Sequence, residues 1–274
     1  MKKYKPTSPA KRHMQTLEKE DVVKTGGYKK LVVRNKKHSG RNSDGKITVR
    51  HRGGGSKRKY RLIDFKGEVR DVPGVVEEVQ YDPNRSANIC LIKWNNGKRT
   101  YVLQAKNMKK DYKIEYGENV EVKDGNRLPL RNIPVGLRLH NVEIKIKKGG
   151  QIARSAGGYV TLKAKHGKYA TLEMPSDEIR LIHIDCEATV GEVGNSEFRN
   201  KTLGKAGKSR MLGRRPRVRG SVMNPVDHPH GGGEGKAPIG RPSPVSPTGV
   251  PALGYKTRDK KKNSTKLIMS KARR

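Results

Sequence analysis

Residues 89–103 read ICLIKWNNGKRTYVL, in which two strand-forming runs flank a turn sequence. The runs Ile89–Trp94 and Arg99–Leu103 are rich in β-branched, aromatic and other apolar residues, a composition typical of half-buried or buried strands. The intervening residues 95–97, Asn-Asn-Gly, favour the left-handed backbone conformations that close a tight hairpin. The stretch therefore predicts an antiparallel hairpin within a β-sheet.

Short runs of the same character lie roughly ten residues apart along the middle of the chain. Alternating or apolar runs occur at Ile47–His51, Val75–Tyr81, His140–Ile146, Val160–Ala164, Ala170–Met174, Ile179–Ile184 and Ala188–Val193. Gly, Asn or Pro separates them, which is typical of small barrels rather than of a parallel sheet. We expect an all-β fold of two small barrels that divide near residues 126–133.

Positive charge is concentrated in the two ends of the chain. The sequence has 62 Lys+Arg against 26 Asp+Glu, a formal net charge of +36. Residues 1–61 and 200–274 each carry a net charge of +16, whereas residues 62–199 hold 23 basic and 19 acidic residues. The predicted organisation is a basic N-terminal extension (1–60), a first barrel (61–126), a second barrel (127–199) and a basic C-terminal extension (200–274).

The C-terminal extension has a composition that opposes independent folding. It contains 11 Gly and 8 Pro with little apolar periodicity, so it cannot bury enough apolar area to offset the entropy lost on ordering. A net charge of this size also repels itself in a compact state and calls for a polyanionic partner. We expect the extension to become ordered on nucleic acid.

Other cellular contexts fit the sequence less well. An anionic membrane is disfavoured because no apolar run approaches the roughly 18 residues that indicate a spanning helix. The basic N-terminus is not followed by an apolar stretch, so no secretory signal is expected. Cys90 and Cys186 form no CxxC pair, and we interpret them as reduced thiols of an intracellular protein.

The first candidate RNA-contacting segment is residues 45–61, GKITVRHRGGGSKRKYR. Glycine has no Cβ, so the backbone can approach a phosphate closely, and the basic side chains supply charge-assisted hydrogen bonds to phosphate oxygens. A solvated basic hairpin with a flexible turn is the alternative. The predicted RNA-binding residues here are Arg50, His51, Arg52, Gly53, Gly54, Gly55, Lys57, Arg58 and Arg61.

Three further loops each present an arginine. The Asp-Pro-Asn turn at residues 82–84 would project Arg85 from the end of a strand. Arg154 lies between two Gly pairs, and Arg131 lies in a proline-stiffened segment that we interpret as the linker between the barrels. An ordinary turn or loop accounts for Arg85 and Arg154 as well as RNA contact does, and a structural role is favoured for Arg131.

The C-terminal extension holds the most unusual segment, MNPVDHPHGGGEGK at residues 223–236. Its prolines hold the two histidines in an extended frame, and its three glycines permit close approach of an RNA groove. The RNA-binding residues predicted in this extension are Lys205, Lys208, Arg214, Arg215, Arg217, Arg219, His228, His230, Gly231, Gly232, Gly233 and Lys236.

Two other interpretations of this extension fail on residue spacing. Residues 204–209, GKAGKS, end like the phosphate-binding loop of an NTPase, but Thr202 stands where that motif requires glycine. His228 and His230 resemble metal ligands, but a zinc site needs about four ligands and no Cys or further His lies nearby. We expect neither a metal site nor a cofactor.

Several segments together resemble the bacterial and organellar form of the large-subunit ribosomal protein family L-two. The resemblance covers nearly the whole chain and is weakest over roughly the first 35 residues. Its most specific segments are residues 47–61, 81–88, 132–136 and, above all, 223–235. Ser56, Met211 and Thr248 depart from the family pattern, which has His at the first position and Trp at the other two, so particular stacking contacts are in doubt.

The resemblance implies an oligonucleotide-binding-type barrel followed by an SH3-like barrel, with both termini extended into RNA. It implies a primary rRNA-binding protein near the subunit interface, in contact with neighbouring ribosomal proteins and connected with subunit association, tRNA binding and the peptidyl-transferase region. The expected location is the ribosome of the cytoplasm or of an organelle, with Mg²⁺ held by the RNA as the cation nearby.

Three hypotheses of function follow. The leading one is a binding and assembly protein whose affinity comes mostly from phosphate neutralisation. The second makes His230 a general base in peptidyl transfer; an imidazole has a suitable pKa, but no partner that fixes its tautomer is readable in the sequence. The third, a chromatin-like DNA binder, is permitted by charge but leaves the nearly neutral double barrel unexplained.

Overall fold

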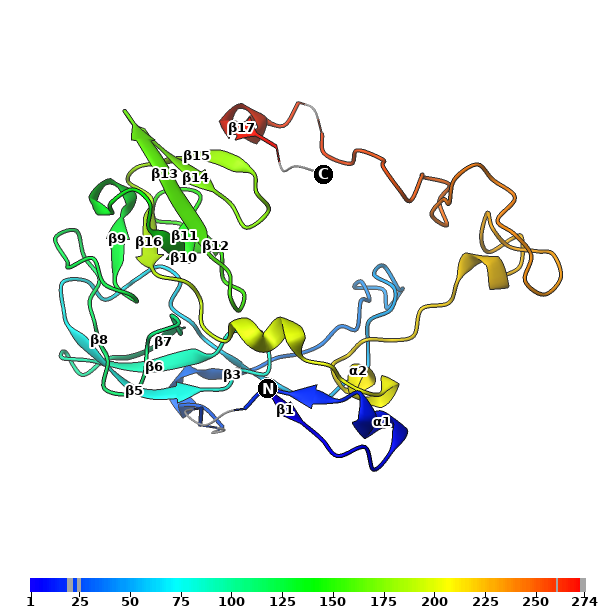
Figure 1. Cartoon of the computed structure of the whole chain (residues 1–274), viewed down its shortest axis with the longest axis horizontal. Coiled ribbons are helices and arrows are strands. Elements are labelled where there is room, and N and C mark those ends of the chain that lie inside the picture. The colour runs from blue at the N-terminus through cyan, green and yellow to red at the C-terminus, as the bar shows by residue number, and fades with distance from the viewer. Residues whose placement is uncertain (19–21, 24–25, 260, 272–274) are drawn as a thin grey trace. The chain divides into compact units, whose positions relative to one another are not determined.

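The chain forms two compact units in the computed structural model, which describes residues 1–18, 22–23, 26–259 and 261–271. Unit 1 comprises residues 1–36, 57–208 and 266–274, and unit 2 comprises residues 37–56 and 209–265. Strands dominate unit 1 (Figure 1), and the helices are short.

The predicted hairpin forms one side of the first sheet of unit 1, with its second strand at the edge. This sheet has the order β7-β6-β5-β8 and contains β5 (Gly74–Gln80), β6 (Ile89–Trp94), β7 (Arg99–Leu103) and β8 (Lys113–Ile114). The Gly97 amide donates to the Trp94 carbonyl at 2.9 Å and Gly97 adopts φ +79°, as a three-residue hairpin loop requires. Trp94 is fully buried, and its indole N–H donates to Thr100 Oγ1 at 2.8 Å.

A second sheet of unit 1 has seven strands in the order β17-β15-β14-β13-β10-β16-β9. Its strands are β9 (Arg127–Pro129), β10 (Arg138–His140), β13 (Val160–His166), β14 (Tyr169–Glu173), β15 (Ile179–His183), β16 (Glu187–Val190) and β17 (Ile268–Ser270). Figure 1 shows β13, β14 and β15 running side by side. Leu128, Leu139, Leu162 and Leu172 are fully buried in one cluster beneath it.

The remaining elements are short. The other strands are β1 (Lys2–Lys3), β2 (Gln15–Thr16), β3 (Val32–Arg34), β4 (Lys59–Arg61), β11 (Val142–Glu143) and β12 (Gly150–Ile152). The helices are α1 (Pro9–Arg12), α2 (Ala206–Met211) and the 3₁₀ turns η1 (Lys29–Leu31), η2 (Leu130–Asn132), η3 (Ser196–Asn200), η4 (Gly220–Val222) and η5 (Asn263–Leu267). Among the described residues, none of the helices has the length and apolar character that crossing a lipid bilayer requires.

A buried charge network ties the loop before the first sheet to the second sheet. Arg127 Nη2 lies 3.0 Å from Glu143 Oε1, and Arg127 Nε lies 2.9 Å from Glu187 Oε2. The other oxygen of Glu187 accepts from Arg70 Nη2 at 2.6 Å. The side chains of Arg127 and Glu143 are 2% and 1% exposed. Because water does not reach them, each charge is stabilised by the opposite charge of its partner.

The predicted all-β fold class is confirmed, but two predicted strands are wrong. The run at residues 140–146 is broken because Asn141 adopts φ +50°, so β10 and β11 belong to different sheets. In unit 2, Ile47 makes an isolated bridge to Arg41 and residues 48–51 form bends and turns. Ile47 and Val49 are 61% and 49% exposed, so their alternation has no buried face. Cys90 and Cys186 are both free and buried, and burial raises the pKa of the Cys186 thiol to about 12.

Candidate nucleic-acid interface

The glycine run of unit 2 is paired with a segment more than 150 residues away in the sequence. The Gly53 amide donates to the Gly213 carbonyl and the Ser56 amide donates to the Met211 carbonyl, both at 3.1 Å. Arg52 and Arg214 form an antiparallel bridge beside these hydrogen bonds. The two most basic segments of the unit therefore become one structure.

The glycines are needed for this pairing as well as for backbone conformation. Gly53, Gly54 and Gly55 all have positive φ, which side-chain-bearing residues rarely adopt. A Cβ at Gly55 would lie 2.8 Å from both the Gly213 nitrogen and the Met211 oxygen. The sequence predicts that these glycines let the backbone approach a phosphate. The structure shows that they also let the backbone of residues 53–55 pack closely on that of residues 211–213.

Arginine side chains gather around this glycine turn. A pocket of about 210 Å³ is lined by Arg41, Arg50, Arg52 and Arg215 together with His51, Gly53 and Gly54. All four arginines are exposed, and none is in an ion pair with a described residue. Arg210 lies beside the turn, and its Nη1 is buried without a hydrogen-bond partner among the described residues. This concentration of unpaired guanidinium groups fits an anionic ligand.

Unit 2 has few acidic residues, and its described residues form no apolar core. It has 17 Lys+Arg against 4 Asp+Glu, a net charge of +13. Among its described residues, His228 alone is buried, and Val226 is 90% exposed. Self-repulsion and the missing core both weaken the isolated unit.

Three predicted arginines of unit 1 contact the 82–84 turn instead, two of them through the fully buried carboxylate of Asp82. Arg85 Nε lies 2.6 Å from Asp82 Oδ2, and Arg61 Nη1 lies 3.7 Å from Asp82 Oδ1. Arg61 is itself buried, at 5% exposure. Arg58 Nη1 donates to the Pro83 carbonyl at 2.6 Å. These contacts hold the 82–84 turn in place, and the alternative of a structural turn, left open for Arg85, accounts for them.

Arg85 and Arg154 come together across one aromatic ring. The guanidinium carbon of Arg154 lies 4.6 Å from the Phe65 ring centroid and that of Arg85 lies 5.8 Å from it. Such cation–π contacts stabilise by about 0.5–1 kcal/mol where solvent is present. Phe65 was not among the predicted site residues, and the sequence offers no local signal for its position between two distant loops.

The other predicted residues are dispersed. Arg131 pairs with Asp185 at the surface, which fits the favoured structural role. Lys57, Arg217, Arg219 and Lys236 are exposed. Lys205 and Lys208 lie at the start of α2, and Gly204 before them packs so closely on Ala10 that a Cβ would collide with its carbonyl oxygen. That packing gives Gly204 a structural role.

The predicted extended frame of the His-Pro-His segment is wrong, because the segment folds into a turn held by its own hydrogen bonds. His228 Nδ1 accepts from the His230 amide at 3.0 Å, and the Gly231 amide donates to the His228 carbonyl at 2.8 Å. The His228 ring packs on Gly220, where a Cβ would collide with the ring. A Cβ at Gly231 would collide with the Asn224 carbonyl oxygen, and Gly232 and Gly233 have positive φ.

The surroundings of His230 do not favour proton abstraction. His230 Nε2 accepts a hydrogen bond from the Val245 amide at 2.9 Å. In a neutral imidazole this acceptor nitrogen carries the only basic lone pair, and it is therefore already engaged. Burial, and then the neighbouring His228 and Arg241, lower the pKa of His230. Among the described residues, no three His, Cys, Asp or Glu side chains are grouped as metal ligands.

The two units together define the class of protein. An all-β unit joined to an arginine-rich, glycine-spaced unit without an apolar core is typical of proteins that bind nucleic acid through its phosphates. Residues 28–115 match the family described as Ribosomal Proteins L2, RNA binding N-terminal domain, and residues 123–249 match Ribosomal Proteins L2, C-terminal domain. The chain belongs to the ribosomal protein L2 family. It is a structural, rRNA-binding constituent of the large ribosomal subunit, not an enzyme, and its location is the ribosome.

Proposed function

We propose that unit 2 is the principal phosphate-binding module of this chain and that it anchors large-subunit rRNA during assembly. In this proposal Arg50, Arg52, Arg214 and Arg215 neutralise phosphates around the glycine turn, and the 228–236 segment extends the same surface. By fixing rRNA in this way the chain would also support subunit association and the architecture around the tRNA and peptidyl-transferase region.

The contrast in ion pairing between the two units carries the proposal. In unit 1, arginines such as Arg70, Arg99, Arg127 and Arg138 are neutralised by glutamates within the protein. No ion pair joins described residues of unit 2, although four arginines line one pocket there. Unit 2 therefore needs counter-charges from outside the chain, and a phosphate backbone supplies them in a row.

The salt dependence of RNA binding tests the proposal. We would measure the affinity of the full chain for large-subunit rRNA at several salt concentrations. Each lost phosphate contact lowers the magnitude of the slope of log K against log salt by about 0.7–0.9. We expect the combined substitution of Arg50, Arg52, Arg214 and Arg215 by Gln to reduce that magnitude by roughly 3.

A matched control removes the same charges elsewhere. The combined substitution of Arg70, Arg99, Arg138 and Arg180 by Gln removes four arginines that are ion-paired within unit 1. We expect a distinctly smaller change in slope for this control. Equal changes for the two variants would show that charge alone matters and would refute a specific role for unit 2.

The proposed roles in subunit association and in the peptidyl-transferase region are tested in assembled subunits. Large subunits reconstituted with the unit 2 variant would be compared with those containing the control variant, by sedimentation for joining to small subunits and by peptide-transfer assays. Because His230 Nε2 is engaged by Val245, we expect subunits containing His230→Gln, whose side-chain oxygen can accept the same hydrogen bond, to retain peptide transfer. Normal assembly with peptide transfer abolished would instead revive a chemical role for His230.

A further inference from the structure

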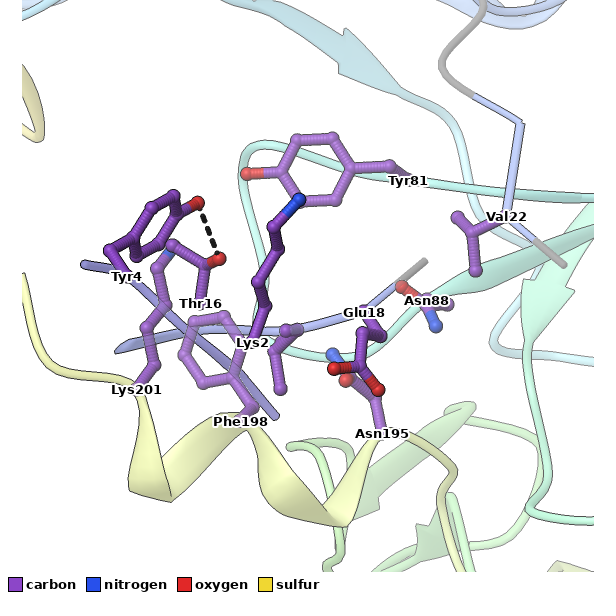
Figure 2. Close-up of a pocket in the computed structure, with 11 residues that line it drawn as sticks. Lys2, Tyr4, Thr16, Glu18, Val22, Tyr81, Asn88, Asn195, Phe198 and Lys201 are labelled. Atoms are coloured by element: carbon purple, nitrogen blue, oxygen red, sulfur yellow. Dashed lines mark hydrogen bonds between the residues drawn. The ribbon is translucent and has the colours of Figure 1, made fainter. Parts of the chain in front are cut away.

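Unit 1 contains a cavity that none of the predicted RNA-binding residues lines. Its volume is about 580 Å³, and it lies between the N-terminal hairpin of β1 and β2, the segment after β5, and η3. Figure 2 shows Tyr4, Tyr81 and Phe198 reaching it from these three segments. The volume lies within the range of pockets that hold small organic ligands.

Hydrogen bonds between distant segments position the lining residues. The Gln15 amide donates to the Thr202 carbonyl at 3.1 Å, and the Thr202 amide donates back at 3.2 Å, which fixes η3 beside the N-terminal hairpin. Tyr4 Oη and Thr16 Oγ1 are 2.9 Å apart, as the dashed line in Figure 2 marks. Two of the segments that bound the cavity are therefore held together by backbone hydrogen bonds.

Aromatic rings and ammonium groups occur together along its wall. Lys2 Nζ lies 6.0 Å from the Tyr4 ring centroid, and Lys201 Nζ lies 5.6 Å from the Phe198 ring centroid. Both rings are only partly buried. A partly exposed ring beside a cation is the combination that single-stranded nucleic acid requires, because the base stacks on the ring while the cation contacts phosphate.

Two lining amides are held in one orientation by the protein. Asn88 Nδ2 donates to Gln104 Oε1 at 3.1 Å, and Asn195 Nδ2 donates to the Ser86 carbonyl at 2.7 Å. With one N–H of each nitrogen used in this way, both residues keep the side-chain oxygen as an acceptor and the second N–H as a donor. Glu18, which also lines the cavity and lies 3.5 Å from the N-terminal amine, adds a further acceptor.

We propose that this cavity binds a single unpaired nucleotide, whose base stacks on Phe198 or Tyr4 and whose phosphate contacts Lys2 or Lys201. The carboxylate of Glu18, which can only accept, favours a base with an exocyclic amino group over uracil. This inference rests on the RNA-binding function of the chain but concerns a different surface from unit 2. An unpaired residue of rRNA is the favoured source, and a free nucleotide shares its chemistry.

The probe is a short RNA duplex with one bulged adenosine, compared with the fully paired duplex of equal length at one salt concentration. We expect the full chain to bind the bulged duplex at least about fivefold more tightly, as base–aromatic stacking predicts, and to bind a bulged uridine less tightly than a bulged adenosine. A 2-aminopurine placed at the bulge should lose fluorescence on binding. Equal affinities for bulged and paired duplexes, or unchanged fluorescence, would overturn the proposal.

Variants locate the effect. Phe198→Leu should abolish the preference for the bulge while leaving affinity for the paired duplex within twofold, and Phe198→Tyr should retain the preference. Tyr169→Leu, which removes an exposed ring from β14, should change neither. If Phe198→Leu weakened both duplexes alike, the pocket would not be a nucleotide site.

Adding millimolar AMP separates the two sources. Loss of the preference for the bulge would support a site that also takes free nucleotides, and an unchanged preference would support a site confined to RNA. The unit 2 variants used to test phosphate binding leave the cavity intact. Failure of either proposal can therefore be recognised independently of the other.

Discussion

His140 shows how far burial can alter a single residue of this chain. Its ring is 1% exposed, and Nδ1 lies 2.8 Å from the Gly191 carbonyl oxygen. A carbonyl can only accept, so Nδ1 carries the proton in the neutral ring. Burial, the largest influence, lowers the pKa of His140 to about 4, although the hydrogen bond to Gly191 opposes this. His140 therefore stays neutral at physiological pH.

This pKa predicts a pH-dependent stability. The unfolded chain binds a proton at His140 below about pH 6.5, whereas the folded chain resists it until about pH 4. The stability that the neutral His140 contributes is thus fully present above pH 6.5 and is lost as the pH falls toward 4. The free energy of unfolding should fall by about 2 kcal/mol between pH 7 and pH 5 for this reason. Urea unfolding at the two pH values measures the loss.

Carboxyl groups also bind protons as the pH falls, and substituted histidines separate the contribution of His140 to the loss of stability from theirs. His140→Gln has no titrating ring, so its stability should fall by about 2 kcal/mol less than that of the wild type over the same interval. His166→Gln, at an exposed position of β13, should behave like the wild type. If all three chains lost the same stability, His140 would not be buried in its neutral form.

At the scale of elements, strands whose own sequence is alternating or apolar were predictable. Strands and buried pairs that depend on a segment far away in the sequence were not. Residues 89–94 and 99–103 have the predicted bounds because composition and turn chemistry agree there. Glu143 is a charged residue within the predicted strand 140–146, but it is fully buried. Its partner Arg127 lies on β9. The sequence of β9 does not alternate between apolar and polar residues, so no local pattern predicts that Arg127 and Glu143 pair.

The glycine turn of unit 2 provides a prediction at the same scale. Gly55→Ala would place a Cβ against the backbone of Gly213, in addition to the strain of φ +89°. The turn should separate from residues 211–213 and disperse the arginine pocket. We expect the affinity for rRNA to fall roughly tenfold, since charge-assisted hydrogen bonds stabilise by about 1.5–3 kcal/mol each.

Gly97→Ala is the matched control for backbone strain. Gly97 adopts a similar φ of +79° in the β6–β7 hairpin, but a Cβ at this position would have no neighbouring atom within 4 Å. This substitution should lower the stability of unit 1 by about 1 kcal/mol and leave RNA affinity within twofold. Equal losses of RNA affinity for the two variants would contradict the role assigned to Gly55.

At the scale of the whole molecule, the charge distribution was readable from the sequence but the assembly of unit 2 was not. Residues 37–56 and 209–265 form one unit although they are far apart in the chain. Neither segment has apolar periodicity, which is the signal that sequence reasoning uses to bring segments together. The candidate residues near the glycine turn were therefore found, whereas Arg41 and Arg210, which complete the arginine cluster, were missed.

The two units should consequently differ in how they depend on RNA. The interior of unit 1 contains fully buried residues such as Ile92 and Leu162, whereas His228 alone is buried among the described residues of unit 2. Local opening is easiest where few apolar contacts are lost. In the free chain we expect the amides of Gly53, Ser56 and Arg215 to exchange with solvent about a thousandfold faster than those of β6 and β13.

Hydrogen exchange with and without rRNA measures this difference. Binding should protect the unit 2 amides strongly, because phosphates replace the repulsion between arginines with attraction. The amides of β6 and β13, already protected by the core, should change little and act as the internal control. If the Gly53 and Arg215 amides were as protected in the free chain as those of β6, unit 2 would be stable by itself and would not gain its order from RNA.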